Sequence, residues 1–151
     1  MLRISLLLII TCSILHAQEI TQITVVEDEN SQSLPSYNYQ GTIYVSLKHL
    51  ADIIHLSSES TEKGNTVEII FQDITLHFKS KNPYVIIKIH DSGESSIYQY
   101  PTSSHFINDL IFVPLNETLE LFNKYYDKSL IVISPGKVII LEKDQKRISR
   151  I

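Results

Sequence analysis

The chain contains the same strand-to-helix pattern twice. Residues 43–56 read IYVSLKHLADIIHL and residues 111–124 read IFVPLNETLELFNK. Both segments open with Ile, an aromatic residue, Val, a small or rigid residue and Leu, and an acidic residue (Asp52, Glu120) follows five places after that Leu. This pattern predicts a short β-strand that turns directly into an amphipathic helix, once in each half of the chain.

Each predicted helix has a start signal and an apolar stripe. Ser46 is expected at the N-cap of the first helix, and Pro114 is tolerated at the start of the second because its missing N–H would lack a partner there. Apolar residues at helical spacing then predict the buried faces. They are Leu47, Leu50, Ala51 and Ile54 in the first helix, which should end near Leu56, and Leu115, Leu119, Phe122 and Tyr126 in the second.

Alternating apolar and polar residues predict strands in the rest of the chain. A first strand is expected within 19–27, a loop over 27–39, a hairpin over 66–79 with its turn at Gln72-Asp73, and a tight turn at Asn108-Asp109. Further strands are expected at 42–45, 84–89, 96–100, 106–107, 110–113, 130–133 and 137–141. The fold class is therefore α+β: a predominantly antiparallel β-sheet packed against two amphipathic helices, with an internal strand-helix repeat.

The N-terminus has the features of a secretory signal peptide. A basic start at Arg3 precedes an apolar run, a small-residue cleavage context at Ala17 and then polar sequence. We expect a signal peptide over 1–17, one domain over 18–142 and a basic tail or linker over 143–151. The run is too short for a membrane anchor, so the mature protein is expected to be exported, periplasmic or extracellular, without an integral membrane span.

Two further features of composition bear on the compartment and the partners. Cys12 is the only cysteine, and an alternative interpretation is the lipid-modified cysteine of a lipoprotein, although Thr11 precedes it where such sites prefer Gly, Ala or Ser. The net charge is −4, which argues against nucleic acid as a partner because nucleic-acid binding usually requires a concentrated basic face.

No pattern in the sequence is typical of catalysis or of a bound cofactor. His49 and His55 are six residues apart and point to different faces of a helix, whereas zinc sites favour closely spaced ligands. His90 and His105 lie beside turns and could meet in space. No Gly-x-Ser-x-Gly motif, calcium loop or phosphate-binding loop occurs. We therefore expect no catalytic residue, no metal ligand and no cofactor, and a protein that is not an enzyme.

The tyrosines are the remaining candidates for a contact with a partner. Most are expected to pack in the sheet, because aromatic residues with polar ends serve both packing and binding. Tyr98 and Tyr100 alternate onto one face of a strand beside Pro101. They are our candidate surface contact.

The two repeated segments carry a resemblance to a known family. Tyr44-Val45-Ser46-Leu47 and Phe112-Val113-Pro114-Leu115 resemble the two helix-start signatures of the copper amine oxidase-like N-terminal (stalk) domain. The hairpin over 67–78 and the segment 98–101 resemble the parts between them, so the resemblance covers about 42–126. In that family this domain has no copper site and no cofactor, so the resemblance implies a scaffold and not an oxidase.

A narrower resemblance concerns residues 81–85, which read KNPYV. They are similar to stalk domains that precede the zinc hydrolase domain of secreted bacterial N-acetylmuramoyl-L-alanine amidases. Our first interpretation is a non-catalytic exported stalk domain of the bacterial cell envelope that acts by binding or spacing, with peptidoglycan or an envelope protein as partner. The alternative is the N-terminal non-catalytic part of a peptidoglycan amidase whose zinc hydrolase domain is absent from this chain. The scattered histidines leave a stand-alone metalloprotein as a third hypothesis, and the oligomeric state stays open.

Overall fold

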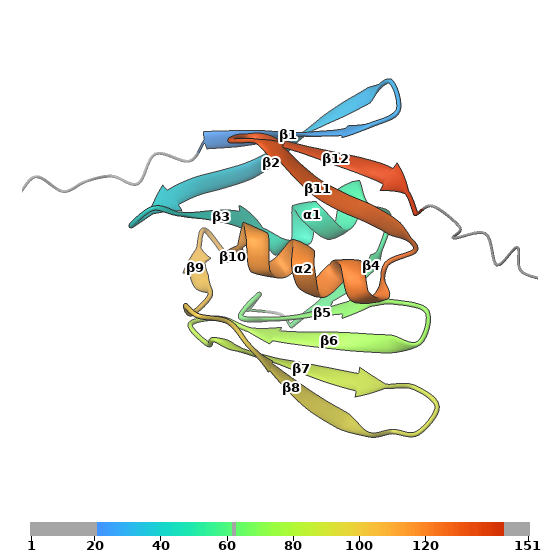
Figure 1. Cartoon of the computed structure of the whole chain (residues 1–151). Helices are drawn as coiled ribbons and strands as arrows, with labels where there is room; N and C mark the ends of the chain where they lie inside the picture. The colour runs from blue at the N-terminus through green and yellow to red at the C-terminus, as the bar shows by residue number, and fades with distance from the viewer. Residues whose placement is uncertain (1–20, 62, 144–151) are drawn as a thin grey trace, which may run out of the picture.

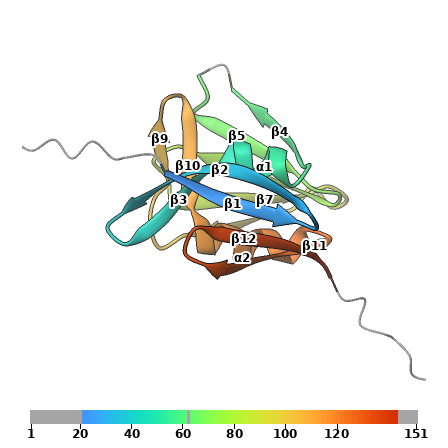
Figure 2. The same cartoon turned by 90° about the horizontal axis from the view of Figure 1, so that it is seen from above.

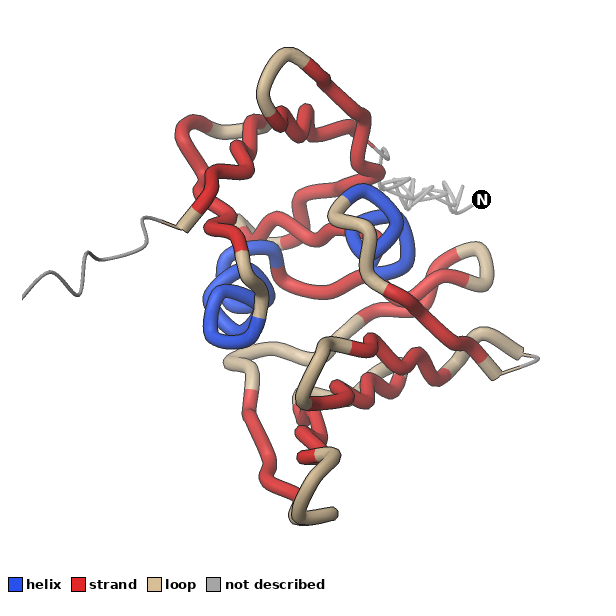
Figure 3. The backbone as a smooth tube through the Cα atoms, turned by 90° about the vertical axis from the view of Figure 1, so that its right-hand side faces the viewer, coloured by secondary structure: helices blue, strands red, loops and turns tan. Residues whose placement is uncertain are grey.

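The computed structural model describes residues 21–61 and 63–143. The signal peptide expected over 1–17 and most of the tail expected over 143–151 lie outside the described residues. In the described part, two β-sheets enclose two helices, and Figures 1 and 3 show the helices between the two groups of strands. The prediction of an α+β fold dominated by antiparallel strands is confirmed, but the strands form two sheets where one was expected.

Sheet A has seven strands in the order β11-β12-β1-β2-β3-β10-β9. All neighbours in it are antiparallel except β1 and β12, which run parallel. Seen from above, β1, β2, β11 and β12 cover the helices (Figure 2). The strands are β1 (Thr21–Glu27), β2 (Asn30–Tyr39), β3 (Thr42–Ser46), β9 (His105–Ile107), β10 (Leu110–Pro114), β11 (Lys128–Ser134) and β12 (Lys137–Glu142).

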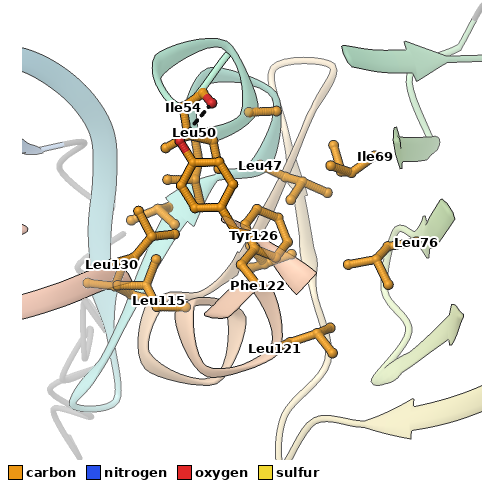
Figure 4. Packing of buried hydrophobic residues seen from close by; sticks show 14 of the residues in the cluster. Leu47, Leu50, Ile54, Ile69, Leu76, Leu115, Leu121, Phe122, Tyr126 and Leu130 are labelled. Atoms are coloured by element: carbon orange, nitrogen blue, oxygen red, sulfur yellow. Dashed lines mark hydrogen bonds between the residues drawn. The ribbon is translucent and has the colours of Figure 1, made fainter. Parts of the chain in front are cut away.

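Sheet B has five strands in the order β4-β5-β6-β7-β8, all antiparallel. Its strands are β4 (Ser57–Ser60), β5 (Thr66–Ile70), β6 (Ile74–Lys79), β7 (Tyr84–Ile89) and β8 (Ser95–Gln99). Strands β5 and β6 form the hairpin that the alternating pattern predicts, and Val67 pairs with Phe78 in it. The inner face of this sheet, which includes Ile69 and Leu76, packs toward the helices (Figure 4).

The two helices follow their strands without a linker. Helix α1 (Leu47–Ile53) begins directly after β3, and α2 (Leu115–Tyr125) begins directly after β10. Helix α1 ends three residues before the expected Leu56. The eight residues predicted to face the core are all buried, with exposed fractions from 0% for Leu47 to 8% for Tyr126. One hydrophobic core therefore joins both sheets and both helices.

The segment predicted as a loop is a strand. Residues 27–39 were expected to form a loop because they are polar and contain Pro35, yet β2 runs through them between β1 and β3. Pro35 pairs with Gln22 of β1, and the pairing of β2 with β3 begins one residue later, at Ser36. The missing N–H of Pro35 therefore lies outside the part of β2 that pairs with β3. The polar residues after α1 also form a strand, β4, at the edge of sheet B.

Candidate functional site

A hollow of about 320 Å³ lies where the C-terminal ends of the two helices meet, and we call it the junction pocket. Three segments that are distant in the sequence line it: residues 54–56 after α1, Phe71 and Gln72 after β5, and residues 125–128 from the last residue of α2 to the first of β11. Its volume lies at the lower end of the range of about 300–1,000 Å³ that is typical of small-ligand sites. The junction pocket is therefore the candidate binding site.

The wall after α1 is shaped by His55. Its N–H donates to Asp52 O at 3.2 Å and the N–H of Leu56 donates to Ala51 O at 2.9 Å, which together form a Schellman ending of the helix. That ending requires a left-handed residue, and His55 adopts φ +58° where glycine is the usual choice. The backbone thus places an exposed imidazole at the edge of the junction pocket.

The wall after α2 is built from adjacent tyrosines with different environments. Tyr126 is buried, and its hydroxyl donates to the carbonyl oxygen of Ile54 at 3.1 Å, so it joins the ends of the two helices (Figure 4). Tyr125 is 38% exposed. Its ring lies 6.2 Å from the ring of Phe71, which in turn meets Phe122 edge-on at 5.3 Å. The junction pocket therefore has an aromatic wall that is partly open to solvent.

The segment between α2 and β11 is held in place by polar contacts. The side chain of Asn123 donates to Leu130 O at 2.9 Å and accepts from Leu130 N at 2.8 Å. Lys143 Nζ donates to Asn123 O at 2.8 Å and also to Tyr126 O, so an ammonium group occupies the negative end of α2.

Lys128 is the cation of the pocket lining, and its charge is already matched. Its Nζ lies 2.6 Å from Glu27 Oε1 and 3.0 Å from Glu142 Oε1. Hydrogen bonds to Glu27, the larger cause, and to Glu142 raise the pKa of Lys128 above its usual value. The ammonium is thus paired with two carboxylates from neighbouring strands.

The structure separates the two tyrosines predicted as a surface contact. Tyr100 is 1% exposed, and its hydroxyl lies 3.0 Å from the hydroxyl of Thr118, so the prediction of a surface contact is wrong for this residue. The shared face of Tyr98 and Tyr100 points inward, where α2 covers it. Tyr98 is partly exposed, and the ammonium of Lys124 lies 4.9 Å from its ring centroid. A contact of Tyr98 with a partner stays a prediction.

Ser46 occupies the expected N-cap position but does not cap the helix with its side chain. Its hydroxyl lies 2.7 Å from His49 Nδ1 instead. The Ser46 side chain is fully buried, whereas His49 is partly exposed.

A second aromatic cluster lies on the face of sheet A that is turned away from the helices, and the sequence did not reveal it. Tyr37, Tyr44 and Phe112 are each 1% exposed, and the His105 ring stacks on Tyr44 at 4.3 Å. The Tyr37 hydroxyl bonds His105 Nδ1. Burial lowers the pKa of His105, and burial raises the pKa of Tyr37, helped by Tyr44 and Tyr39. Tyr37 and Tyr44 come from the consecutive strands β2 and β3, whereas His105 lies 68 residues after Tyr37, so no local pattern predicts that the rings meet.

The other histidines have separate partners. His90 Nε2 lies 2.9 Å from Thr75 Oγ1, and His77 Nδ1 lies 2.9 Å from Glu68 Oε1. His90 and His105, which were expected to be able to meet, thus bond to different residues. Within residues 21–61 and 63–143, no three His, Cys, Asp or Glu side chains are grouped as a metal site would require.

No family model, curated protein or solved structure matches this chain. The resemblance to copper amine oxidase-like stalk domains therefore stays a prediction from the sequence. Neither helix of the part that the structure describes has the length and apolar character needed to cross a membrane.

Proposed function

We propose that this chain is a non-catalytic exported domain of the bacterial cell envelope that binds peptidoglycan or an envelope protein through the junction pocket. The observation that carries the proposal is the convergence of three distant segments on one hollow with an exposed aromatic ring, Tyr125, in its wall. Aromatic rings at the centre of a contact often supply much of its binding energy. The signal-peptide features and the stalk-like signatures support the compartment and the type of domain.

The pairing of β3 with β10 supports a related proposal, that the two strand-helix units are an internal repeat. Val45 pairs with Val113, Tyr44 with Pro114 and Ser46 with Phe112. A constant offset of 68 residues relates the two units, so this pairing has a local two-fold symmetry about the Val45–Val113 pair. The turns that precede the two strands, at 40–41 and 108–109, differ by the same offset, and all four of their residues have positive φ. The buried stripes described above support amphipathic character in both helices.

Retention on isolated sacculi tests the proposed function. We expect the wild-type protein to co-sediment with purified sacculi and Tyr125→Ala to lose roughly tenfold or more in retention, as removal of a central aromatic contact predicts. Tyr84→Ala is the matched control, because Tyr84 is 47% exposed on the outer face of sheet B. Equal retention of the Tyr125→Ala variant and the wild-type protein would contradict the proposed role of the pocket. An absence of retention for the wild-type protein would contradict the peptidoglycan form of the proposal.

A further inference from the structure

We propose that the junction pocket holds a neutral sugar unit of a glycan chain, with an apolar face of the sugar ring against Tyr125. This inference rests on the proposed function and names the chemical class of its ligand. It follows from the aromatic wall, the polar groups around it, the charge of the lining and the rigidity of the walls.

The aromatic wall provides a surface for the C–H face of a sugar. Tyr125 is 38% exposed, and Phe71 beside it is 5% exposed, so a solvent-facing ring is backed by a buried one. A pyranose ring has faces made of C–H groups and an edge made of hydroxyls. An aromatic ring can cover such a face without leaving any hydrogen-bonding group unpaired.

The polar groups of the lining suit hydroxyls. Gln72 offers donors and acceptors, Asp127 offers acceptors, and the His55 ring offers one nitrogen of each type when neutral. Each sugar hydroxyl both donates and accepts, so a mixed lining can satisfy it. His55 is held in a left-handed conformation, at φ +58°, that disfavours residues with a Cβ. Contact between the imidazole and a ligand is a role that glycine at position 55 could not fill.

The charge of the lining disfavours an anionic ligand. Lys128 is paired with Glu27 at 2.6 Å and Glu142 at 3.0 Å, and Lys143 donates to backbone carbonyls. Both nearby ammonium groups are therefore engaged, and the carboxylate of Asp127 adds further negative charge. A phosphate or carboxylate would have to compete with these partners, whereas an uncharged sugar would not.

The walls are fixed before any ligand binds. The Tyr126 hydroxyl ties the end of α2 to Ile54, and the Asn123 side chain ties α2 to both backbone groups of Leu130. A pocket that is already ordered loses less entropy on binding. Its volume of about 320 Å³ suits a small unit of a chain better than a large ligand.

A titration followed by NMR tests the inference. The full chain is titrated with an uncharged β-1,4-linked tetramer of N-acetylglucosamine and, separately, with inorganic phosphate. We expect the tetramer to shift amide signals of residues 54–56, 71–72 and 125–128, and phosphate to leave them unchanged. Tyr125→Ala should weaken tetramer binding by about tenfold or more, while Tyr125→Phe and the control Tyr84→Ala should bind as the wild type does.

Each outcome of the titration decides the inference. An absence of shifts up to the solubility limit of the tetramer, shifts on other surfaces, or unchanged binding by Tyr125→Ala would overturn it, as would phosphate shifting the same signals. Retention on sacculi without tetramer binding would overturn the sugar inference and leave the envelope function standing. Tetramer binding without retention on sacculi would leave the sugar inference standing and contradict the peptidoglycan form of the proposed function. Because Tyr125→Phe keeps the ring and removes only the hydroxyl, its normal binding shows that a loss in Tyr125→Ala comes from the missing ring.

Discussion

The hydroxyl of Tyr126 donates a hydrogen bond of 3.1 Å to the carbonyl oxygen of Ile54, a residue 72 positions earlier in the chain. Ile54 is the C-cap of α1 and Tyr126 is the C-cap of α2, so this bond fixes the distance between the two helix ends. Both side chains are buried and belong to the main hydrophobic core. The shape of the junction pocket therefore depends on the same contact that closes the core at this end.

Replacement Tyr126→Phe tests that dependence. The change leaves a buried carbonyl without its donor, so the free energy of unfolding should fall by about 1 kcal/mol. Urea unfolding measures it, and Tyr125→Phe is the control because that neighbouring residue is exposed and its hydroxyl makes no hydrogen bond to the described residues. Equal midpoints for Tyr126→Phe and the wild type would show that the bond does not stabilise the fold.

Replacement His55→Gly separates stability from binding. Glycine adopts φ +58° without a Cβ clash, and the relief of this clash should exceed the entropy that the more flexible glycine loses on folding. The variant should therefore gain about 0.5–1 kcal/mol in the free energy of unfolding. It should also bind the sugar probe more weakly, because the imidazole is gone. Gln40→Gly is the matched control: Gln40 has φ +50° in a turn away from the junction pocket, so that variant should gain stability and bind normally. Normal binding by His55→Gly would exclude the imidazole from the contact.

Acid should destabilise the protein through His105. Burial lowers its pKa in the folded protein, so below about pH 6.5 the unfolded chain binds a proton that the folded one does not. Stability is therefore lost as the pH falls from about 6.5 toward the lowered pKa. His105→Phe keeps a ring against Tyr44 but cannot be protonated, so its melting temperature should fall less than that of the wild type between about pH 7.5 and about pH 5.5. Parallel declines in the two proteins would contradict this assignment.

Strand β11, at one edge of sheet A in the described part of the chain, should make the protein prone to self-association. Strand β11 is an edge strand, and its residues 129–134 carry no charge while Ile131 is 42% and Ile133 is 50% exposed. Ile133→Lys should reduce association at high concentration, measured by sedimentation velocity, and change the free energy of unfolding by less than about 0.5 kcal/mol. Thr24→Lys adds the same charge on β1 in the interior of the sheet, so it is the control. An equal effect of both substitutions would point to net charge and not to the edge.

The sequence predicted the parts of the fold that have a local cause. The starts of both helices follow from the apolar spacing after Ser46 and Pro114, and the hairpin over 66–79 follows from its alternation. Strand β2 was missed because its inward residues Leu34 and Ser36 share a polar segment with Pro35. Periodicity assigns residues to faces and not to partner strands, so it could not show that the strands divide between two sheets.

The sequence predicts less of the candidate site than of the fold. The alternation of Tyr98 and Tyr100 correctly places them on one face, but it does not say whether that face points to solvent or toward α2. The junction pocket combines residues 54–56, 71–72 and 125–128, which no sequence window brings together. Its one local signal is the pair Tyr125-Tyr126 at the end of a predicted helix, where the helical spacing assigns Tyr126 to the core and leaves Tyr125 outside the apolar stripe.

We propose that the junction pocket is the surface that meets the cell envelope. Hydrogen exchange of the protein bound to intact sacculi, read by mass spectrometry, would locate this surface. We expect slower exchange in peptides that contain residues 54–56, 71–72 and 125–128, and unchanged exchange in the peptide that contains β7, which lies between β6 and β8 in sheet B and does not line the pocket. Protection of β7 or of residues 129–134 of β11, with no change around the junction pocket, would contradict this role of the pocket.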